Sequence, residues 1–272
     1  MIECVPNFSE GRDAAKVRAI AESIAAIERV RLLGWELDPD HHRSVITFVG
    51  EPDDVVRAAV RGVGKAAELI NLHQHQGVHP RVGAADVVPF IPLDGSTIKD
   101  CVTAAHQAGA EIWSRFGIPV YFYEHAALRP ERRPLQHTRR PGFDGRPPDI
   151  GAIAAHATAG AVMVGARGFL IAFNARLKTA DVAAARAIAS KIRESSGGLK
   201  GVKAIGLYLT SQGRAQVSMN LIDADLDAVY SAISAVAEIE AWELIGYVPR
   251  SIYDRFPAFF HRAENFTPAR IL

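Results

Sequence analysis

Cysteine is scarce in this chain of 272 residues, and charge of one sign is not in excess. Cys4 and Cys101 are the only cysteines, and they lack the paired spacing of a zinc ribbon or a redox dithiol. We therefore expect two reduced, mostly structural thiols. The formal net charge of +1 provides no long-range field that would attract nucleic acid or an anionic membrane surface.

Long hydrophobic runs are also absent. No segment approaches the roughly 20 consecutive apolar residues that a membrane-spanning helix needs. The amino terminus shows neither the basic region nor the apolar run of a secretory signal. With 49% hydrophobic and 22% charged residues, the composition is that of a globular protein. We therefore expect a cytoplasmic protein without a membrane partner.

Apolar periodicity in the first half predicts strands that alternate with helices. The predicted strands are Glu3–Phe8, Val30–Leu37, Ser44–Val49, Asp86–Ile91 and Pro119–Tyr123, and the predicted helices are Asp13–Ile27, Asp53–Ile70 and Thr97–Phe116. This order is βαββαβ followed by an additional αβ pair. It is the order of a ferredoxin-like unit.

The second half repeats the scheme. Its predicted strands are Phe169–Phe173, Val202–Leu209, Ala215–Leu221 and Glu243–Val248, and its predicted helices are Thr179–Glu194 and Asp225–Glu240. We predict an α+β protein of two ferredoxin-like subdomains, residues 1–166 and 167–272. Facing sheets with the helices outside would bury both open sheet faces and leave a cleft for a ligand.

The connector, residues 129–150, belongs to the first subdomain and is rich in arginine, proline and glycine. Its prolines exclude a long helix, so we expect a solvated connector that serves as a linker or lid. Its arginines include Arg132, Arg133, Arg139 and Arg140. They lack the interleaved aromatic residues on which bases stack, and we expect no nucleic-acid partner.

The segment Gly77–Phe90 concentrates chemically active side chains between a predicted helix and a predicted strand. Loops at strand edges aim side chains from a rigid scaffold. His79 is the first catalytic candidate, because an imidazole with a pKa near about 6.5 exchanges protons at neutral pH. Pro80 and Arg81 on its carboxyl side limit its freedom. The alternative is a turn histidine that only bonds a carbonyl group.

Several long motifs follow one another along the chain. They are Glu3–Gly11, His42–Val45 with Thr47–Gly50, His79–Arg81 with Gly83–Ala84 and Asp86–Val87, Gly165–Arg167, Leu170–Asn174 and Ala215–Leu221. Together they resemble the glutamate formiminotransferase family over essentially the whole chain. The resemblance is to the standalone form without a cyclodeaminase domain, because the chain ends at Leu272.

The resemblance implies an enzyme that transfers a formimino group between N-formimino-L-glutamate and N5 of tetrahydrofolate. This reaction belongs to histidine degradation and one-carbon metabolism. Tetrahydrofolate would be the co-substrate, and no metal is implied. The resemblance also implies a homodimer, with the folate in a tunnel between the two sheets of each chain.

The resemblance assigns the general base to His79, which would take the N5 proton and then protonate the departing glutamate amine. It also implies an aspartate just before the strand that begins at Arg43. Asp38 and Asp40 are both candidates, and we favour Asp40. The alternative for either is a turn or capping aspartate.

The resemblance places the folate-binding segment before Gly165. Its residues are Gly151, Ala152, Ile153, Ala154, Ala155, His156, Ala157, Thr158, Ala159 and Gly160. Arg43, Arg81 and Arg167 are candidates to pair with carboxylates of formiminoglutamate or of the folate tail, or else form structural ion pairs. The chain departs from many relatives at His42, where asparagine is common.

Three other functions are open on sequence grounds. A metal-dependent hydrolase would use the candidate ligands His41, His42, His73, His75, His79 and Asp86. His73 and His75 lack the i, i+4 spacing of helical metalloprotease ligands, which argues against this. A transferase with another formyl or formimino donor and a folate-binding protein without turnover are the remaining alternatives.

Overall fold

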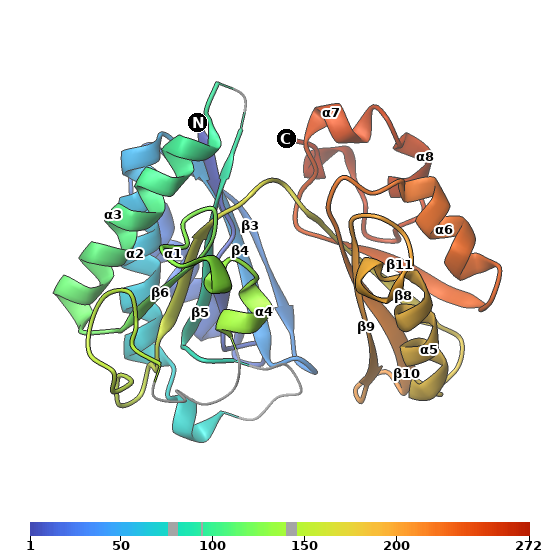
Figure 1. Cartoon of the computed structure of the whole chain (residues 1–272), viewed down its shortest axis with the longest axis horizontal. Coiled ribbons are helices and arrows are strands. Elements are labelled where there is room, and N and C mark those ends of the chain that lie inside the picture. The colour runs from blue at the N-terminus through green and yellow to red at the C-terminus, as the bar shows by residue number, and fades with distance from the viewer. Residues whose placement is uncertain (76–80, 94, 140–145) are drawn as a thin grey trace. The chain divides into compact units, whose positions relative to one another are not determined.

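The computed structural model describes residues 1–75, 81–93, 95–139 and 146–272. The chain divides into two compact units, Met1–Gly168 and Phe169–Leu272, and each is described by itself. Each unit has one β-sheet with helices packed on it (Figure 1). The prediction of an α+β fold built from ferredoxin-like units is confirmed by the strand orders given below.

The first unit contains a seven-stranded sheet. Its strands are β1 (Ile2–Cys4), β2 (Asn7–Phe8), β3 (Val30–Asp38), β4 (Arg43–Gly50), β5 (Ala85–Pro92), β6 (Val120–Glu124) and β7 (Val162–Ala166). β1 and β2 both lie between β4 and β5 and pair with each in antiparallel fashion. With β3 beside β4, these strands have the ferredoxin-like order, and β7 and β6 extend the sheet by parallel pairing.

Two features of this sheet differ from the prediction. The predicted strand Glu3–Phe8 is broken into β1 and β2 at Val5 and Pro6, because proline has no N–H to donate to a neighbouring strand. The Pro6 carbonyl still accepts a hydrogen bond from the N–H of Ile46 at 3.1 Å. Strand β7 was not predicted, and it lies between β5 and β6 in the sheet.

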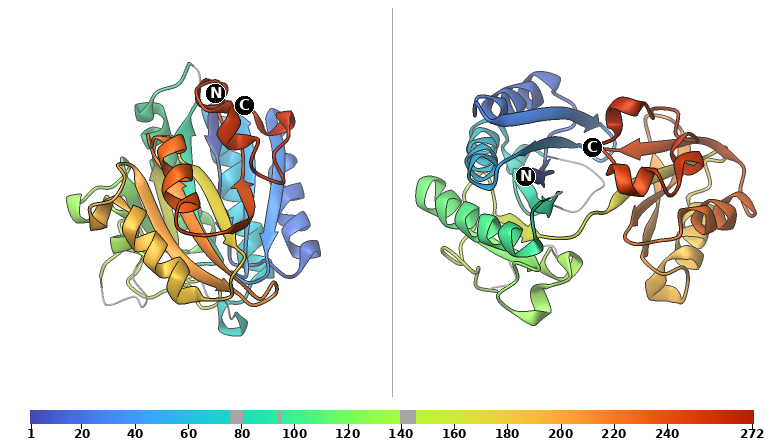
Figure 2. Two further views of the ribbon diagram at one scale, coloured as in Figure 1. Left: turned by 90° about the vertical axis from the view of Figure 1, so that its right-hand side faces the viewer. Right: turned by 90° about the horizontal axis from the view of Figure 1, so that it is seen from above.

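Three helices cover one face of the first sheet (Figures 1 and 2). They are α1 (Ala14–Ala25), α2 (Pro52–Leu69) and α3 (Ile98–Phe116). Asp13 caps α1 by accepting hydrogen bonds from the N–H groups of Ala15 and Lys16. The stripe Val17, Ile20, Ala21 and Ile24 is buried, as expected for an amphipathic helix on a sheet.

The connector packs on the opposite face of this sheet. It contains the turn η2 (Pro130–Arg132) and the short helix α4 (Leu135–Thr138). Leu135 contacts a buried cluster that includes Val87, Tyr121 and Tyr123, and Arg132 is buried and paired with Asp149 at 2.7 Å. Other connector residues, such as Glu131 and Arg133, are exposed, so the connector is solvated only in part.

The second unit has the antiparallel strand order β11-β8-β10-β9. Its strands are β8 (Ile171–Leu177), β9 (Val202–Leu209), β10 (Arg214–Leu221) and β11 (Ile239–Ile245). Its helices are α5 (Val182–Ile192), α6 (Leu226–Ser234), α7 (Arg250–Tyr253) and α8 (Pro257–Phe260), with the turns η3 (Glu194–Ser196) and η4 (Pro268–Arg270). From one edge of the sheet to the other, these are the fourth, first, third and second strands of the unit, which is the ferredoxin-like order.

The predicted helix Asp225–Glu240 is too long. Helix α6 ends at Ser234, and β11 begins at Ile239 rather than at Glu243. A tertiary contact explains the difference. Ile239 of β11 pairs with Leu177 of β8, and a bulge follows before Ala241. Strand pairing therefore determines the structure of residues whose local pattern is also compatible with a helix.

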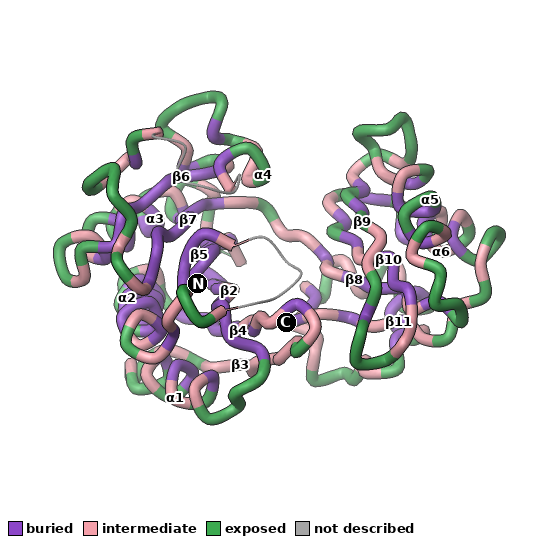
Figure 3. The backbone as a smooth tube through the Cα atoms, turned by 90° about the horizontal axis from the view of Figure 1, so that it is seen from below, coloured by how far each residue is buried: buried purple, intermediate pink, exposed green. Residues whose placement is uncertain are grey.

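Both cysteines lie in the core of the first unit, where buried residues follow β4 to β7 and α2 (Figure 3). Both thiols are free. Burial raises the pKa of both, that of Cys101 to about 12, which keeps them as unreactive thiols. None of the helices in the described part of the chain has the length and apolar character that a membrane span requires.

Candidate active site

The candidate site lies at the end of the first sheet where β4 and β5 begin, on the face opposite helices α1 to α3. Strand β3 reaches this end with Trp35 and Leu37 packed toward the core. Because side chains alternate along a strand, Glu36 and Asp38 lie on the opposite face. Asp38 is directly across from Arg43, the first residue of β4.

An arginine cluster, Arg43, Arg81 and Arg139, gathers around Asp86. Asp86 is buried, accepts a hydrogen bond from the N–H of Val82 at 2.7 Å and forms an ion pair with Arg139. Burial lowers the pKa of Arg43 to about 10; the Arg139 charge acts in the same direction, and Asp38 and Asp86 oppose it. Burial also lowers the pKa of Arg81, again opposed by Asp86. Three guanidinium groups close together favour an anionic ligand such as a carboxylate.

Asp38 and Asp40 have different surroundings. Asp38 accepts hydrogen bonds from the backbone N–H of His41 at 2.8 Å and from the His41 ring. Burial alone would raise the pKa of Asp38, but these hydrogen bonds hold it below its usual value. Asp40 lies in the turn between β3 and β4. The site prediction favoured Asp40, and Asp38 is the one that shares a strand register with Arg43.

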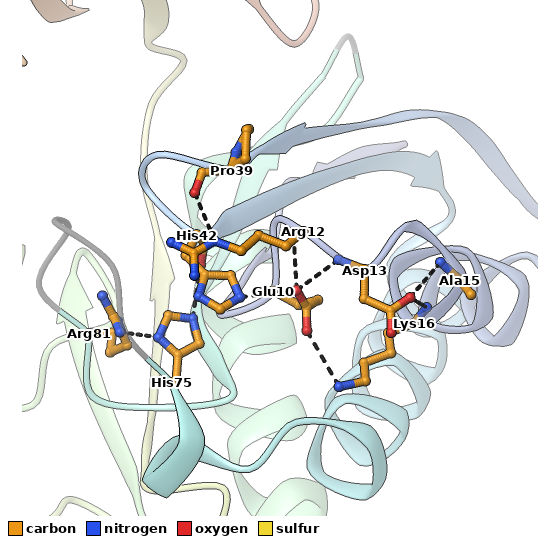
Figure 4. A network of polar contacts seen from close by, with 9 residues as sticks. All are labelled: Glu10, Arg12, Asp13, Ala15, Lys16, Pro39, His42, His75 and Arg81. Atoms are coloured by element: carbon orange, nitrogen blue, oxygen red, sulfur yellow. Dashed lines mark hydrogen bonds and ion pairs between the residues drawn. The ribbon is translucent and has the colours of Figure 1, made fainter. Parts of the chain in front are cut away.

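A polar network links the start of α1 to Arg81 (Figure 4). The Glu10 carboxylate accepts hydrogen bonds from the backbone N–H groups of Arg12 at 2.9 Å and Asp13 at 3.0 Å. The Nε2 of His42 lies 3.1 Å from the same carboxylate oxygen. Burial would raise the pKa of Glu10, but these hydrogen bonds and the nearby His42 lower it.

His42 and His75 form the centre of this network. Their rings stack with centroids 3.8 Å apart and an angle of 15° between the planes. The Nε2 of His75 lies 3.0 Å from the His42 carbonyl oxygen, and its Nδ1 contacts Nη1 of Arg81. Burial lowers the pKa of His75 to about 4, and the charges of Arg81 and His42 add to this effect. His75 is therefore neutral at pH 7.

His79 lies outside the described residues, as do the other residues from 76 to 80. The structure does place the residues on either side of this segment. His75 and Arg81 contact each other directly, and Arg81 belongs to the arginine cluster. In the sequence, the predicted base lies between these two contacting residues.

The predicted folate-binding segment lies beside the residues that follow Arg81. The Ala159 carbonyl accepts a hydrogen bond from the Ala84 N–H at 2.9 Å, and the Ala161 N–H donates to the Val82 carbonyl at 2.9 Å. His156 and Gly160 are bridged by two backbone hydrogen bonds. Residues 151–155 are exposed, including Ile153 at 56%. The structure thus brings together two motifs that are more than 70 residues apart in the sequence.

Arg167 lies away from the arginine cluster. Its N–H donates to the Phe90 carbonyl at 3.1 Å, near the other end of β5, and its side chain interacts with Tyr123. Glu3, which pairs with Ile91 on β5, is also in this region. Burial raises the pKa of Glu3 to about 7, and the Arg167 charge opposes the shift.

Glu3 and Arg139 were not among the predicted site residues. A glutamate between apolar residues in a predicted strand was a signal for Glu3, because a carboxylate rarely occupies a buried strand. Nothing local singled out Arg139 from the other connector arginines. Its role at Asp86 follows from the way the connector packs on the sheet.

The metal hypothesis receives no support from the described residues, among which no three histidine, cysteine or carboxylate side chains are placed to hold an ion. His41 contacts Asp38, and His73 lies 2.7 Å from the Ala157 carbonyl oxygen. His42 and His75 are occupied by the network described above. His79, the remaining candidate histidine, lies outside the described residues.

Comparison with known proteins gives consistent matches. Residues 1–167 match the model of the formiminotransferase domain, N-terminal subdomain, and residues 172–266 match that of the formiminotransferase domain. The chain is 38% identical over its whole length to the glutamate formimidoyltransferase of Thermoplasma acidophilum, 96% of which is covered. It is 36% identical to that of Streptococcus pyogenes serotype M1, over 98% of this chain and 95% of the relative. The formimidoyltransferase-cyclodeaminase of Sus scrofa is 36% identical over 97% of this chain, which covers 53% of that protein.

Proposed function

Since the chain belongs to the formiminotransferase family, we propose that it is a glutamate formimidoyltransferase of histidine degradation. It moves the formimino group between N-formimino-L-glutamate and N5 of tetrahydrofolate, which is a co-substrate. The observation that carries the proposal from the structural side is the arginine cluster. It includes Arg81, which follows His79 and Pro80 in the sequence, and supplies positive charge for a donor with two carboxylates.

The chemistry exchanges one carbon–nitrogen bond for another. N5 of tetrahydrofolate attacks the formimino carbon, the bond from that carbon to the glutamate nitrogen breaks, and glutamate leaves as the amine. We propose that His79 takes the proton from N5 and delivers it to the leaving nitrogen. Such general acid–base assistance is worth about 10²–10⁴-fold in rate. Correct alignment of the two substrates supplies much of the remainder.

We assign Arg43 and Arg81 to the donor carboxylates. A guanidinium presents two parallel N–H donors that match the two oxygens of a carboxylate. Asp86 forms an ion pair with Arg139, the third member of the cluster, and its negative charge acts on Arg43 and Arg81. Arg167 is at the other end of β5, so we assign it to a different anionic group, the carboxylate of the folate tail.

For the catalytic carboxylate the geometry favours Asp38 over Asp40. Asp38 shares the register of Arg43 and remains ionised, since its hydrogen bonds with His41 hold its pKa low. An ionised carboxylate stabilises the cationic amidine carbon or an imidazolium next to it. Asp40 would then be a turn residue between β3 and β4.

We propose residues 151–160 as the folate-binding segment. Its exposed part is made of glycine, alanine and Ile153, which allow a flat pterin ring to approach the backbone closely. The segment is hydrogen-bonded to Val82 and Ala84, so a pterin there would lie near the residues that follow Arg81.

The family resemblance also supports a wider description of the protein. We propose residues 1–166 and 167–272 as its two functional subdomains and a homodimer as its assembly. Two free, buried cysteines support a reducing, cytoplasmic location. Its partners would be the two small-molecule substrates.

The test is release of L-glutamate from N-formimino-L-glutamate by the purified protein. Glutamate should appear only when tetrahydrofolate is present, because the folate accepts the group. Release at the same rate without folate would identify a hydrolase and would contradict the proposal. N-formyl-L-glutamate and formiminoglycine, offered separately, would reveal a transferase with another donor.

A further inference from the structure

We propose that His75 is a positioning residue that fixes the guanidinium of Arg81 for binding of the donor carboxylate. The identity of the carboxylate rests on the proposed function. The contact itself rests on the geometry of the network in Figure 4. His75 touches neither the reacting carbon nor the folate in this proposal, and it acts only through Arg81.

The direction of each hydrogen bond follows from the chemistry of the partners. A backbone carbonyl only accepts, so the hydrogen of the His75 ring must be on Nε2, which lies 3.0 Å from the His42 carbonyl oxygen. A guanidinium only donates, so Nδ1 of His75 must be the acceptor from Nη1 of Arg81. A single neutral tautomer of His75 satisfies both partners at once.

The His75 ring is itself held in place by the His42 ring. His42 stacks on it at 3.8 Å, and the His42 ring is in turn held by the Glu10 carboxylate. Glu10 is fixed by the backbone N–H groups of Arg12 and Asp13 at the start of α1. The guanidinium of Arg81 is thus tied, through three side chains, to the rigid end of a helix.

Burial, assisted by nearby positive charges, keeps His75 in the acceptor state. Arg81 faces it from one side and His42 from the other, while the more distant Glu10 carboxylate acts in the opposite direction. Protonation of Nδ1 would replace the acceptor by a donor and place two cations in contact. With its pKa lowered to about 4, chiefly by burial, His75 keeps its lone pair throughout the physiological range.

Kinetics of the full chain test the role. In His75→Phe a planar ring remains to stack on His42, but both hydrogen bonds are lost. We expect the KM for N-formimino-L-glutamate to rise by roughly 10-fold, as for loss of one hydrogen bond to a charged group. The kcat and the KM for tetrahydrofolate should change less than about twofold. His75→Asn, which offers an oxygen near the position of Nδ1, should recover part of the loss.

A double variant separates positioning from general damage. In an Arg81→Ala background, His75→Phe should raise the donor KM no further, because the group on which His75 acts is missing. An additive effect, or an equal loss in kcat and in both KM values, would overturn the proposal. Thermal unfolding by circular dichroism confirms that the variants are folded.

A second measurement does not depend on turnover. Nitrogen-15 spectra of the histidine rings should show His75 protonated on Nε2 and bare on Nδ1 from pH 7 down to pH 5. A ring protonated on Nδ1 at pH 7, or doubly protonated at pH 6, would overturn the proposal. If the wild type fails to transfer the formimino group, the proposed function fails, and these spectra still decide the contact between His75 and Arg81.

Discussion

Arg81 joins the histidine network to the arginine cluster. It contacts the neutral acceptor His75, and the charges of Asp86 and Arg139 act on its guanidinium group. It also follows directly after His79 and Pro80 in the sequence. A side chain held in this way presents a preorganised donor fork and loses little conformational entropy when a carboxylate binds.

The contribution of that fork can be measured by comparing two substitutions. Arg81→Ala removes the charge and the donors, and we expect the donor KM to rise roughly 100-fold. Arg81→Lys keeps the charge but not the paired donors, so a rise of roughly 10-fold is expected. Arg18→Ala, on the exposed face of α1, is the control. Steady-state kinetics with equal effects of Ala and Lys would argue that geometry at Arg81 is unimportant.

Glu3 makes stability depend on pH in a defined direction. Its carboxyl group has a pKa of about 7 in the folded chain, against an ordinary value of 4.5. Between these values the folded state keeps the proton and the unfolded state loses it, so the free energy of unfolding falls as pH rises. Above about pH 7 this contribution is constant.

Glu3→Gln should remove this dependence, because the amide does not titrate. Urea unfolding at pH 5 and pH 8 should show a smaller loss of stability in the variant, by up to about 3 kcal/mol. Glu28→Gln, at an exposed position, should behave like the wild type. If Glu3→Gln loses as much stability as the wild type between these pH values, Glu3 is not buried as the structure shows.

At the scale of elements, the site depends on residues 151–161, whose end is hydrogen-bonded to Val82 and Ala84, just before β5. Gly160 has a φ of +70°, and a Cβ atom there would lie 2.2 Å from the Val82 carbonyl oxygen. Neither the left-handed backbone nor the contact is compatible with a larger residue. The close approach positions residues 151–159 beside the segment that contains Arg81.

Gly160→Ala should therefore destabilise the first unit by at least about 2 kcal/mol. We also expect weaker binding of tetrahydrofolate, since the proposed folate segment would shift. Gly168→Ala is the matched control, because nothing lies within 4 Å of the position of its Cβ and its φ is not positive. Denaturant unfolding and folate titration in which both variants behave alike would contradict the account.

The sequence predicted the elements that are determined by local features and missed those that depend on pairing with distant residues. Helix α1 was predicted from its apolar stripe and its cap at Asp13, both local features. Strand β7 was missed because five small or apolar residues after an alanine-rich segment carry no alternation, and its pairing with β5 and β6 is non-local. The end of α6 was misplaced for the same reason, since strand pairing with Leu177 decides it.

The sequence likewise predicted part of the site and missed the contacts between distant residues. Arg43 and Arg81 were chosen as chemically suitable side chains within ordered motifs, and the structure brings both near Asp86. Arg167 had the same chemistry, but β5 separates it from them. The pairing of His42 with His75 has no local signature, because it joins a turn after β3 to residues after α2.

At the scale of the whole molecule, both units contain the ferredoxin-like strand order, but the residues proposed for binding and catalysis lie in the first unit. The arginine cluster, the histidine network and the proposed folate segment all belong to Met1–Gly168. The second unit has its own core around Phe173, Leu244 and Phe259, and among the described residues its strands pair only with one another. It should therefore fold without the first unit.

A fragment of residues 169–272 tests this independence. We expect cooperative thermal unfolding with the far-ultraviolet circular dichroism of a mixed α/β domain, because a complete core remains. The fragment should have no transferase activity, since it lacks the residues assigned to chemistry. A fragment that stays unfolded, or one that turns over substrate alone, would each contradict this division.

The most direct test of the central claim is the ultraviolet absorbance of the folate after purified protein is mixed with tetrahydrofolate and N-formimino-L-glutamate. We predict a change that requires both substrates and scales with the amount of wild-type protein. His79→Ala should slow it by about 10²–10⁴-fold, and His125→Ala, an exposed histidine, should not. No absorbance change with the wild type, or equal rates for the wild type and His79→Ala, would contradict the account.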